Sequence, residues 1–194
     1  MEVFCPITVD YAGKTYNTIK ISDQCWLKEN LDVGTMIDGT TSQTNNGMVE
    51  KFCYDDDITN CDAYGGLYQW EEAMQYTTTP GTQGICPSGW HIPTYAEFQT
   101  LIRAVNGDGR ALKAIGQGVG DGAGTNTSGF SALLSGYQRH DGAYLHLGYY
   151  TYFWSSIEYN DIVANYLHLS HNNNFIYFYY GYKKSVISVR CLQD

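Results

Sequence analysis

Charge is scarce in this sequence. Only 16% of the 194 residues are Asp, Glu, Lys or Arg, and the 20 acidic side chains outnumber the 11 basic ones. The net charge of -9 argues against nucleic acid and anionic membranes as partners, because both are bound through clustered Lys and Arg. No segment approaches the ~20 consecutive apolar residues of a membrane span. The composition therefore predicts neither nucleic-acid binding nor membrane insertion.

Several catalytic and metal-binding signatures are also missing. There is no Cys-x-x-Cys pair, which disfavours zinc knuckles and thioredoxin-type redox sites. There is no Gly-x-Ser-x-Gly nucleophile elbow either. The glycine-rich stretch 116–129 is not followed by Lys-Ser or Lys-Thr and opens no helix pattern, so a phosphate-binding loop is disfavoured. We interpret this stretch as a flexible surface loop.

Histidines and acidic residues give little support for a metal site. His168 and His171 lie in a segment that alternates polar and apolar residues, and residues three apart on a strand face opposite sides. His91, beside Trp and close to Pro, is interpreted as a packed, hydrogen-bonded group. The run Asp55–Asp57 lacks the spacing of a calcium loop. We therefore expect no cofactor, with calcium at this run as the open alternative.

Six cysteines are dispersed along the chain. Their even number, without metal-ligand spacing, favours disulfides in an oxidised, extracellular protein. Several connectivities are possible, so spacing alone does not determine the pairing. The segment from Met1 to Pro6 has neither the basic nor the apolar region of a signal peptide. We therefore expect that no signal peptide is present in this chain.

Strands are predicted at both ends of the chain. Runs rich in β-branched residues at 7–10 and 13–21 flank a turn at 11–13 and predict a hairpin. Cys25–Leu27 is predicted to form a short strand, and Ser185–Cys191 is expected to form a final strand.

Two short helices are predicted between these strands. Thr94–Glu97 fits a capping box, and the apolar spacing after it predicts an amphipathic helix that follows Pro93. Leu67–Tyr76 is the second helix candidate. Residues 32–65 show little periodicity and are expected to be irregular. Because there is no internal repeat and no linker, the whole chain 1–194 is predicted to be one domain.

Tyrosine is concentrated near the C-terminus. Residues 137–182 contain 11 of the 18 tyrosines and four of the five histidines, with only four charged residues. Tyr mixed with Asn, Ser, His and Gly is the composition of antibody paratopes. In Tyr149–Tyr152 and Tyr177–Tyr182, strand neighbours point to opposite faces, so the rings cannot all enter a core. Some aromatic surface is therefore expected to be exposed, as at interaction sites.

Five motifs occur in order along the chain. They are Ile21-x-x-Gln24-Cys25-Trp26-Leu27-x-Glu29-Asn30-Leu31, Tyr64-Gly65-Gly66-Leu67-Tyr68-x-Trp70-x-x-Ala73, Cys86-Pro87-Ser88-Gly89-Trp90-His91-Ile92-Pro93-Thr94-x-x-Glu97-Phe98, Gly129-Phe130-Ser131-Ala132-Leu133-x-x-Gly136-Tyr137-x-Arg139, and Phe153-Trp154-Ser155-Ser156-x-Glu158 with Ser188-Val189-Arg190-Cys191. With these motifs the chain, from about Thr8 to Asp194, resembles the Fibrobacter succinogenes major paralogous domain.

The resemblance implies an α+β, C-type-lectin-like fold, distantly similar to formylglycine-generating enzyme. In such a fold two short helices pack on a small mixed or antiparallel sheet, with much irregular loop. By family position the resemblance also implies three disulfides, Cys5–Cys25, Cys53–Cys61 and Cys86–Cys191. The scaffold core is expected to contain Trp26, Trp70, Trp90, Phe98, Leu101 and Trp154.

Members of this family look like secreted or surface proteins of bacteria. Some are variable proteins of diversity-generating retroelements in bacteria and phages, in which mutagenised Asn codons near the end of the gene become Tyr, Ser, His, Asp and similar residues. Residues 140–187 have this mixture and are the expected variable ligand-binding region. The candidate contact residues are Tyr144, His146, Tyr149, Tyr150, Tyr152, Tyr159, Asn160, Asp161, Asn165, Tyr166, His168, Ser170, His171, Asn172, Asn173, Asn174, Tyr177, Tyr179, Tyr180 and Tyr182.

The expected function is therefore non-enzymatic binding of a protein or glycan on a cell or on the surface of a phage host. The expected location is outside or on the surface of a bacterium, or on a phage virion. A structural cell-surface or fibre-tip module without a diversified ligand is the alternative. An enzyme of the formylglycine-generating type is disfavoured, because the reactive cysteine of that enzyme has no clear counterpart here.

Overall fold

The computed structural model describes residues 4–194. The first three residues, which begin the segment that lacks signal-peptide features, lie outside the described part. Among residues 4–194, no helix combines the length and the apolar character that a membrane crossing requires.

The N-terminal strands belong to an antiparallel sheet in the order β1-β2-β3-β14-β7. The predicted hairpin and the short strand at Cys25–Leu27 are both confirmed. Ala12 and Gly13, with φ of 49° and 80°, form the hairpin turn. The strands are β1 (Thr8–Tyr11), β2 (Lys14–Ile21), β3 (Gln24–Leu27), β7 (Trp90–His91) and β14 (Leu192–Gln193).

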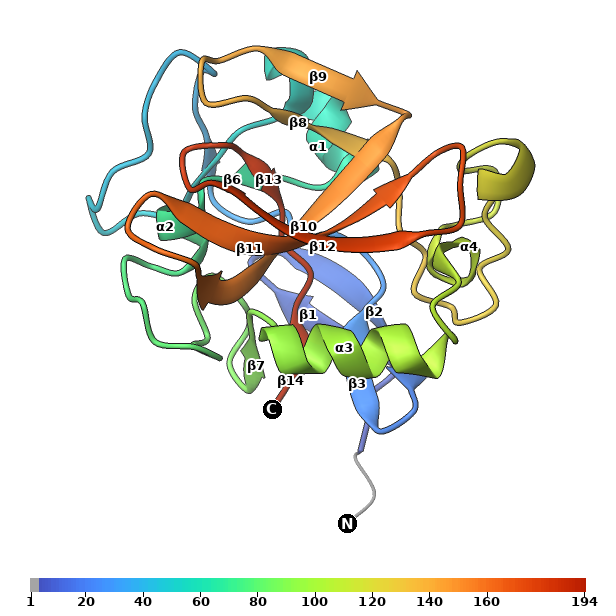
Figure 1. Ribbon diagram of the computed structural model, residues 1–194. Helices are drawn as coiled ribbons and strands as arrows, with labels where there is room; N and C mark the ends of the chain where they lie inside the picture. The colour runs from blue at the N-terminus through green and yellow to red at the C-terminus, as the bar shows by residue number, and fades with distance from the viewer. Residues whose placement is uncertain (1–3) are drawn as a thin grey trace.

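A second sheet has the order β12-β11-β10-β13-β6. Its three long strands are consecutive in the chain and antiparallel, and they cross the centre of Figure 1 with α3 below them. The strands are β6 (Leu67–Tyr68), β10 (Tyr150–Glu158), β11 (Val163–Ser170), β12 (Ile176–Tyr182) and β13 (Ile187–Ser188).

The prediction of a single final strand at Ser185–Cys191 is wrong, because the chain there passes from one sheet to the other. β13 pairs within the second sheet, whereas β14 pairs within the first. Between them, the guanidinium of Arg190 is fully buried and donates hydrogen bonds to the carbonyl oxygens of Leu27 and Phe130 and to Asn30 Oδ1. Burial lowers the pKa of Arg190 to about 9. These contacts connect the last motif of the sequence to the first.

Two smaller strand pairs complete the sheets. They are the parallel pair β4 (Thr35–Met36) and β5 (Glu50–Lys51), and the antiparallel pair β8 (Ser135–Gln138) and β9 (Tyr144–Leu147), which lies above the long strands in Figure 1. Most of 32–65 is irregular, as expected. It also contains η1 (Tyr54–Asp56) and α1 (Ile58–Tyr64), and α1 was not anticipated.

The helix predicted after Pro93 is confirmed as α3 (Tyr95–Ala104), with both halves of its capping box formed by Thr94 and Glu97. The helix predicted over Leu67–Tyr76 is shorter than expected. Only α2 (Trp70–Ala73) is helical, because Leu67–Tyr68 pairs with β13 as β6. The remaining short helices are α4 (Gly109–Leu112) and η2 (Gly120–Gly122). The chain is thus a mixed α+β protein with several small sheets.

The predicted core and the predicted disulfides are confirmed. All four tryptophans are at most 4% exposed, and Phe98 and Leu101 are fully buried. The disulfides are Cys5–Cys25, Cys53–Cys61 and Cys86–Cys191. Three disulfides are consistent with a secreted or extracellular domain.

His91 is the packed, hydrogen-bonded group that the sequence predicts. Its Nδ1 lies 2.7 Å from Asp194 Oδ1, and its Nε2 lies 3.0 Å from Glu97 Oε1. Burial alone would lower the pKa of His91, but the hydrogen bonds that the ring donates to the two carboxylates outweigh burial and raise the pKa.

A raised pKa makes the contribution of His91 to stability depend on pH. The protonated ring stabilises the fold fully below the unfolded-state pKa of ~6.5, and this contribution is lost as the pH rises through the folded-state value. We therefore expect His91→Gln to lower the free energy of unfolding more at about pH 5.5 than at about pH 8.5, in urea denaturation. Equal losses at both pH values would contradict the ion pairs.

Candidate ligand-binding face

The register of β10, β11 and β12 shows on which side of the sheet each predicted contact residue of these strands lies. His168 of β11 lies opposite Tyr152 of β10 and Tyr177 of β12, and Tyr166 lies opposite Tyr179. Because side chains alternate along a strand, these residues share one side of the sheet. We call this side the aromatic face, which consists of Tyr150, Tyr152, Tyr166, His168, Tyr177 and Tyr179.

The rings of the aromatic face form a continuous layer. The ring centroids of Tyr152 and His168 lie 5.0 Å apart with planes 12° from parallel, and those of His168 and Tyr177 lie 4.9 Å apart at 26°. Tyr177 continues the layer to Tyr179 at 5.9 Å. The layer therefore crosses all three strands.

The aromatic face carries no formal charge at neutral pH. Burial lowers the pKa of His168 to about 4, and the nearby His146 lowers it further. Burial also raises the pKa of Tyr152 and of Tyr166, so their hydroxyls stay protonated. The face thus offers aromatic surface, hydroxyl groups and a neutral imidazole. This chemistry suits hydrogen bonding and stacking.

The opposite side of the same strands belongs to the core. Phe153 of β10 and Leu167 of β11 are fully buried in one cluster with Trp26 and with Phe98 of α3. On the aromatic face, Tyr152 and Tyr166 pack against a second core cluster that contains Trp154. Tyr150, Tyr177 and Tyr179 belong to no core cluster, so side chains at these positions can change without disturbing the core.

Some predicted contact residues form a second group, away from the aromatic face. Tyr159, Asn160 and Asp161 lie in the turn between β10 and β11. Asn165 lies opposite Tyr180, on the other side of the sheet by strand alternation. The rings of Tyr159 and Tyr180 stack at 4.6 Å. This group therefore lies apart from the aromatic face.

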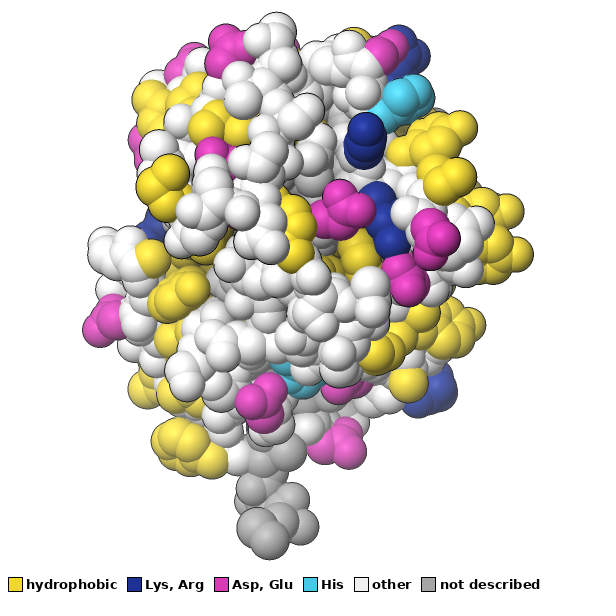
Figure 2. Space-filling model, turned by 90° about the vertical axis from the view of Figure 1, so that its left-hand side faces the viewer, with side chains coloured by type: hydrophobic (Ala, Val, Ile, Leu, Met, Phe, Trp, Pro, Cys, Tyr) yellow, Lys and Arg dark blue, Asp and Glu magenta, His cyan; other side chains and the backbone are white. Residues whose placement is uncertain are grey.

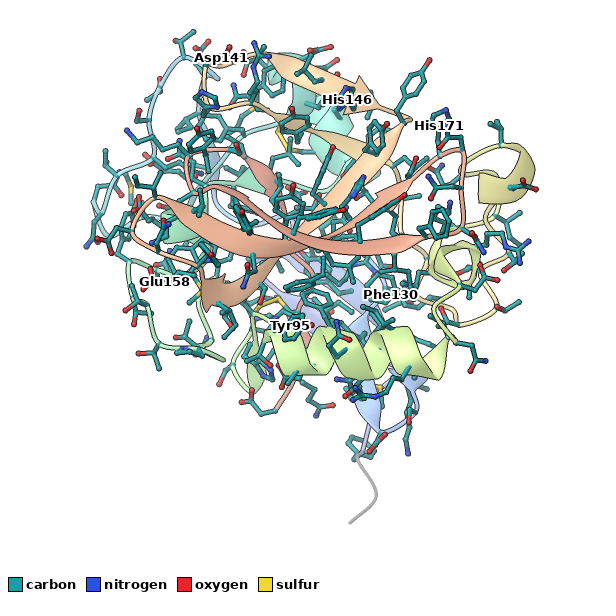
Figure 3. All side chains as sticks on the ribbon, viewed as in Figure 1. Tyr95, Phe130, Asp141, His146, Glu158 and His171 are labelled. Atoms are coloured by element: carbon teal, nitrogen blue, oxygen red, sulfur yellow. A yellow bond between two sulfur atoms is a disulfide. The ribbon has the colours of Figure 1, made fainter. Side chains whose placement is uncertain are left out.

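His146 and His171 lie at one end of the aromatic face. Their rings are 4.8 and 6.2 Å from that of Tyr150, and Figure 3 shows both at the end opposite Glu158. The ring of the exposed Tyr149 lies 4.7 Å from that of His171. These three residues extend the face beyond the strands.

The expectation that His168 and His171 face opposite sides is wrong, because β11 ends at Ser170 and strand alternation does not reach His171. Both rings lie against Tyr150, at 5.3 and 6.2 Å. Within the described chain, no group of three or more His, Cys, Asp or Glu side chains is placed to hold a metal ion.

Three other predicted residues occupy different positions. Tyr144 donates a 2.8 Å hydrogen bond to Asp56 Oδ1 and packs against Tyr54, so it supports the β8–β9 hairpin. Ser170 is only 2% exposed and does not reach the surface. Tyr182 extends from the end of β12 and contacts His140 at 4.7 Å.

The carboxylates of Asp55–Asp57 have different environments. Asp56 Oδ1 also accepts a hydrogen bond from the backbone of Gly39, and Asp57 Oδ1 caps α1 by accepting from the backbone of Thr59. Two of the three carboxylates proposed for calcium are thus already hydrogen-bonded within the protein.

The turn between β11 and β12, which contains Asn172, Asn173 and Asn174, is held through its backbone. The ammonium group of the buried Lys113 donates to the carbonyl oxygens of Ser170 and Asn173, at 2.6 and 2.9 Å. Burial lowers the pKa of Lys113 to about 8. Because only main-chain acceptors are used, the side chains of the turn are not needed for this contact. The sequence patterns gave no indication of this role for Lys113.

The glycine-rich loop supports the same turn and is packed more closely than the expected flexible surface loop. The backbone of Val119 donates to the carbonyl of His171 at 2.7 Å. Outside this loop, the backbone of Gly109, at the start of α4, donates to the carbonyl of Asn174 at 2.7 Å. A Cβ atom on Gly122 would lie only 2.2 Å from the carbonyl oxygen of His171. Glycine is therefore required where the two backbones meet.

A cavity of about 250 Å³ opens beside the aromatic face. Tyr152 and Tyr166 form part of its wall, together with Tyr137 of β8 and the buried Trp154. We call it the aromatic cavity. Tyr137 and Trp154 belong to the sequence motifs and are therefore expected in the scaffold. Strand patterns do not indicate that β8 comes close to β10.

The predicted tyrosines of the variable region are accessible. None of the ten is buried, and Tyr149, Tyr159, Tyr179, Tyr180 and Tyr182 are each more than half exposed. Figure 2 shows hydrophobic side chains, a class that includes Tyr in that view, gathered along its right-hand edge, which is the side that faces the viewer in Figure 1. An exposed aromatic surface of this kind is typical of interaction sites.

Comparison with known proteins gives one family. The model described as Fibrobacter succinogenes major domain matches residues 19–193. No curated protein and no solved structure matches the chain.

Proposed function

The chain belongs to the Fibrobacter succinogenes major domain family, and from this premise we propose that it is a non-enzymatic binding protein with a diversified C-terminal face. Its scaffold is C-type-lectin-like. Its partners are proteins or glycans on a cell or on the surface of a phage host. It acts outside or on the surface of a bacterium, or on a phage virion.

One observation carries this proposal: the part of the aromatic face on β12 is separate from the packing that holds this strand. Tyr177 and Tyr179 stack on the open side of β12, while Phe178 between them packs toward the core cluster. Residues of the open side can therefore be exchanged while the sheet stays intact. Diversification by mutagenised codons requires such a separation.

The residue types support binding rather than catalysis. Tyr supplies rigid contact area with a polar tip, and the Asn-rich turn adds adaptable hydrogen-bonding groups. The central rings would contribute most of the affinity, as aromatic anchors do at other interfaces.

A display experiment tests whether the aromatic face can acquire partners. A library varied at Tyr150, His168, Tyr177 and Tyr179 is selected against one purified protein that the parent chain does not bind. We expect folded binders with melting temperatures close to that of the parent, because the varied side chains lie outside the core. A matched library varied at exposed Tyr95, Ile115 and Val119 is the control and should give none.

Genome context tests the native role. We expect a reverse-transcriptase gene near this gene, with a near-copy of its 3′ end, and sequence differences between isolates confined to codons of the proposed face. If both elements are absent and the codons are invariant, a structural surface or fibre-tip module is the better description.

A further inference from the structure

The aromatic cavity contains hydroxyl groups without a protein partner. Among residues 4–194, no hydrogen-bond partner is found for the hydroxyls of Tyr137, Tyr152 and Tyr166. The ring of Tyr152 lies 5.1 Å from that of Tyr137 and 5.5 Å from that of Tyr166, the latter at 82°. The cavity thus combines ring faces with free polar groups in a small volume.

A polar depression of about 310 Å³ adjoins the aromatic cavity. The two share Arg139 and His140 as a common wall. On the far side of this wall the depression is lined by hydroxyl and amide groups, including those of Thr41, Ser42 and Gln69. Asp141, labelled at the upper edge of Figure 3, forms an ion pair with Arg139. Each volume is near or below the lower end of the ~300–1,000 Å³ range of drug-sized sites, so each suits one ring-sized group.

A glycine keeps the aromatic cavity open. Gly181 of β12 lines it, and a Cβ atom on this residue would lie 2.8 Å from the ring of Tyr166. A larger residue would therefore push into the space between β12 and Tyr166.

We propose that the aromatic cavity and the polar depression are two adjoining subsites for a neutral oligosaccharide, an assignment that rests on the proposed binding function. One sugar ring stacks among the tyrosines, and the next ring contacts the hydroxyls and amides of Thr41, Ser42 and Gln69. A sugar ring has an apolar C–H face and a rim of hydroxyls, which matches an aromatic wall with free hydroxyl groups.

Other ligand classes fit less well. An aliphatic or aromatic side chain of a partner protein would leave the tyrosine hydroxyls unpaired once water is excluded, which is unfavourable. A cation would meet Arg139 and Lys184, which both line the depression. An anion would meet a protein with a net charge of -9, and the pairing of Arg139 with Asp141 leaves Lys184 as the remaining cation of the depression.

The first test applies the purified chain to an array of immobilised neutral and anionic oligosaccharides. We expect binding to neutral members. Absence of any neutral binding, or binding to anionic members only, would overturn the assignment.

The second test locates the two subsites by calorimetric titration with the best neutral oligosaccharide and with its terminal monosaccharide. The oligosaccharide should bind about tenfold more tightly, because it occupies both subsites. Tyr152→Ser and Gly181→Val should each weaken both ligands by about tenfold or more. The double variant Thr41→Val with Ser42→Ala should weaken only the oligosaccharide. Tyr95→Ser, on α3, is the control and should change neither affinity.

Two further measurements distinguish failure of the sugar assignment from misfolding of a variant and from failure of the proposed binding function. Each variant is accepted only if its circular dichroism spectrum and melting transition match those of a folded chain. Gly181→Val fills the cavity and Tyr152→Ser removes part of its wall, so the test does not depend on one variant being folded. Unchanged sugar affinity in both Gly181→Val and Tyr152→Ser would overturn the subsites. If the display library gives protein binders while the parent chain binds no sugar, the binding function stands and the sugar assignment fails.

Discussion

Replacing both Cys86 and Cys191 by Ala is expected to lower the free energy of unfolding by about 4–5 kcal/mol. This disulfide joins residues 105 positions apart, and a bridge that closes so long a loop removes much of the conformational freedom of the unfolded chain. It also holds the residue before β14 to the loop before β7, where both strands share a sheet. Urea denaturation of the oxidised parent and of the double variant measures the difference.

The disulfide Cys53–Cys61 is the matched control. Its cysteines are also fully buried, but they lie only 8 positions apart, so the same relation gives about 2.5 kcal/mol for Cys53→Ala with Cys61→Ala. A larger loss for this pair than for Cys86 and Cys191 would mean that native packing, rather than loop closure, dominates the effect of the disulfides.

Elements with a local signal could be predicted from the sequence. The capping box at Thr94 and Glu97 specifies where α3 begins, because its two hydrogen bonds involve residues within one turn. The β1–β2 hairpin depends on alternating residues around one tight turn. α1 also has a local signal, an Asp at its N-cap and a Gly after its end, although the weak periodicity of 32–65 favours irregular structure there.

Elements that depend on distant partners could not be predicted in this way. Leu67 and Tyr68 have helical spacing with Trp70, yet they form β6 because β13, more than 100 residues later, pairs with them. Tertiary pairing overrides local periodicity in such cases. The division of the last strand into β13 and β14 has the same cause.

The candidate site likewise combines features that follow from local sequence with features that depend on distant residues. Alternation along each strand predicts that Tyr179 and Tyr180 point to opposite sides, and the structure agrees. Composition alone could not place Tyr144 against Asp56 or Lys113 beneath the β11–β12 turn, since both contacts join residues 57 or more positions apart. The family resemblance supplied the disulfide pairs, which spacing left open.

Trp154→Ala is expected to lower the free energy of unfolding by about 3–5 kcal/mol, because it leaves a large cavity beneath the aromatic face. Trp154 is 1% exposed, its ring lies 6.2 Å from that of Tyr166, and its Nε1 donates a 2.8 Å hydrogen bond to the carbonyl oxygen of Tyr68. Trp154→Phe keeps most of the apolar volume and loses this hydrogen bond, so a smaller loss of about 1–3 kcal/mol is expected.

Tyr179→Ser provides the contrast, because Tyr179 is on the aromatic face but 55% exposed. Its effect on the free energy of unfolding should stay within about 0.5 kcal/mol, the range of surface substitutions. Chemical denaturation of Trp154→Ala, Trp154→Phe and Tyr179→Ser under the same conditions ranks their losses in the free energy of unfolding. Since a diversified face must tolerate exchange of its residues, a loss for Tyr179→Ser comparable to that for Trp154→Ala would show that the face is part of the structural core. The separation of binding surface from scaffold, on which the proposed function depends, would then be lost.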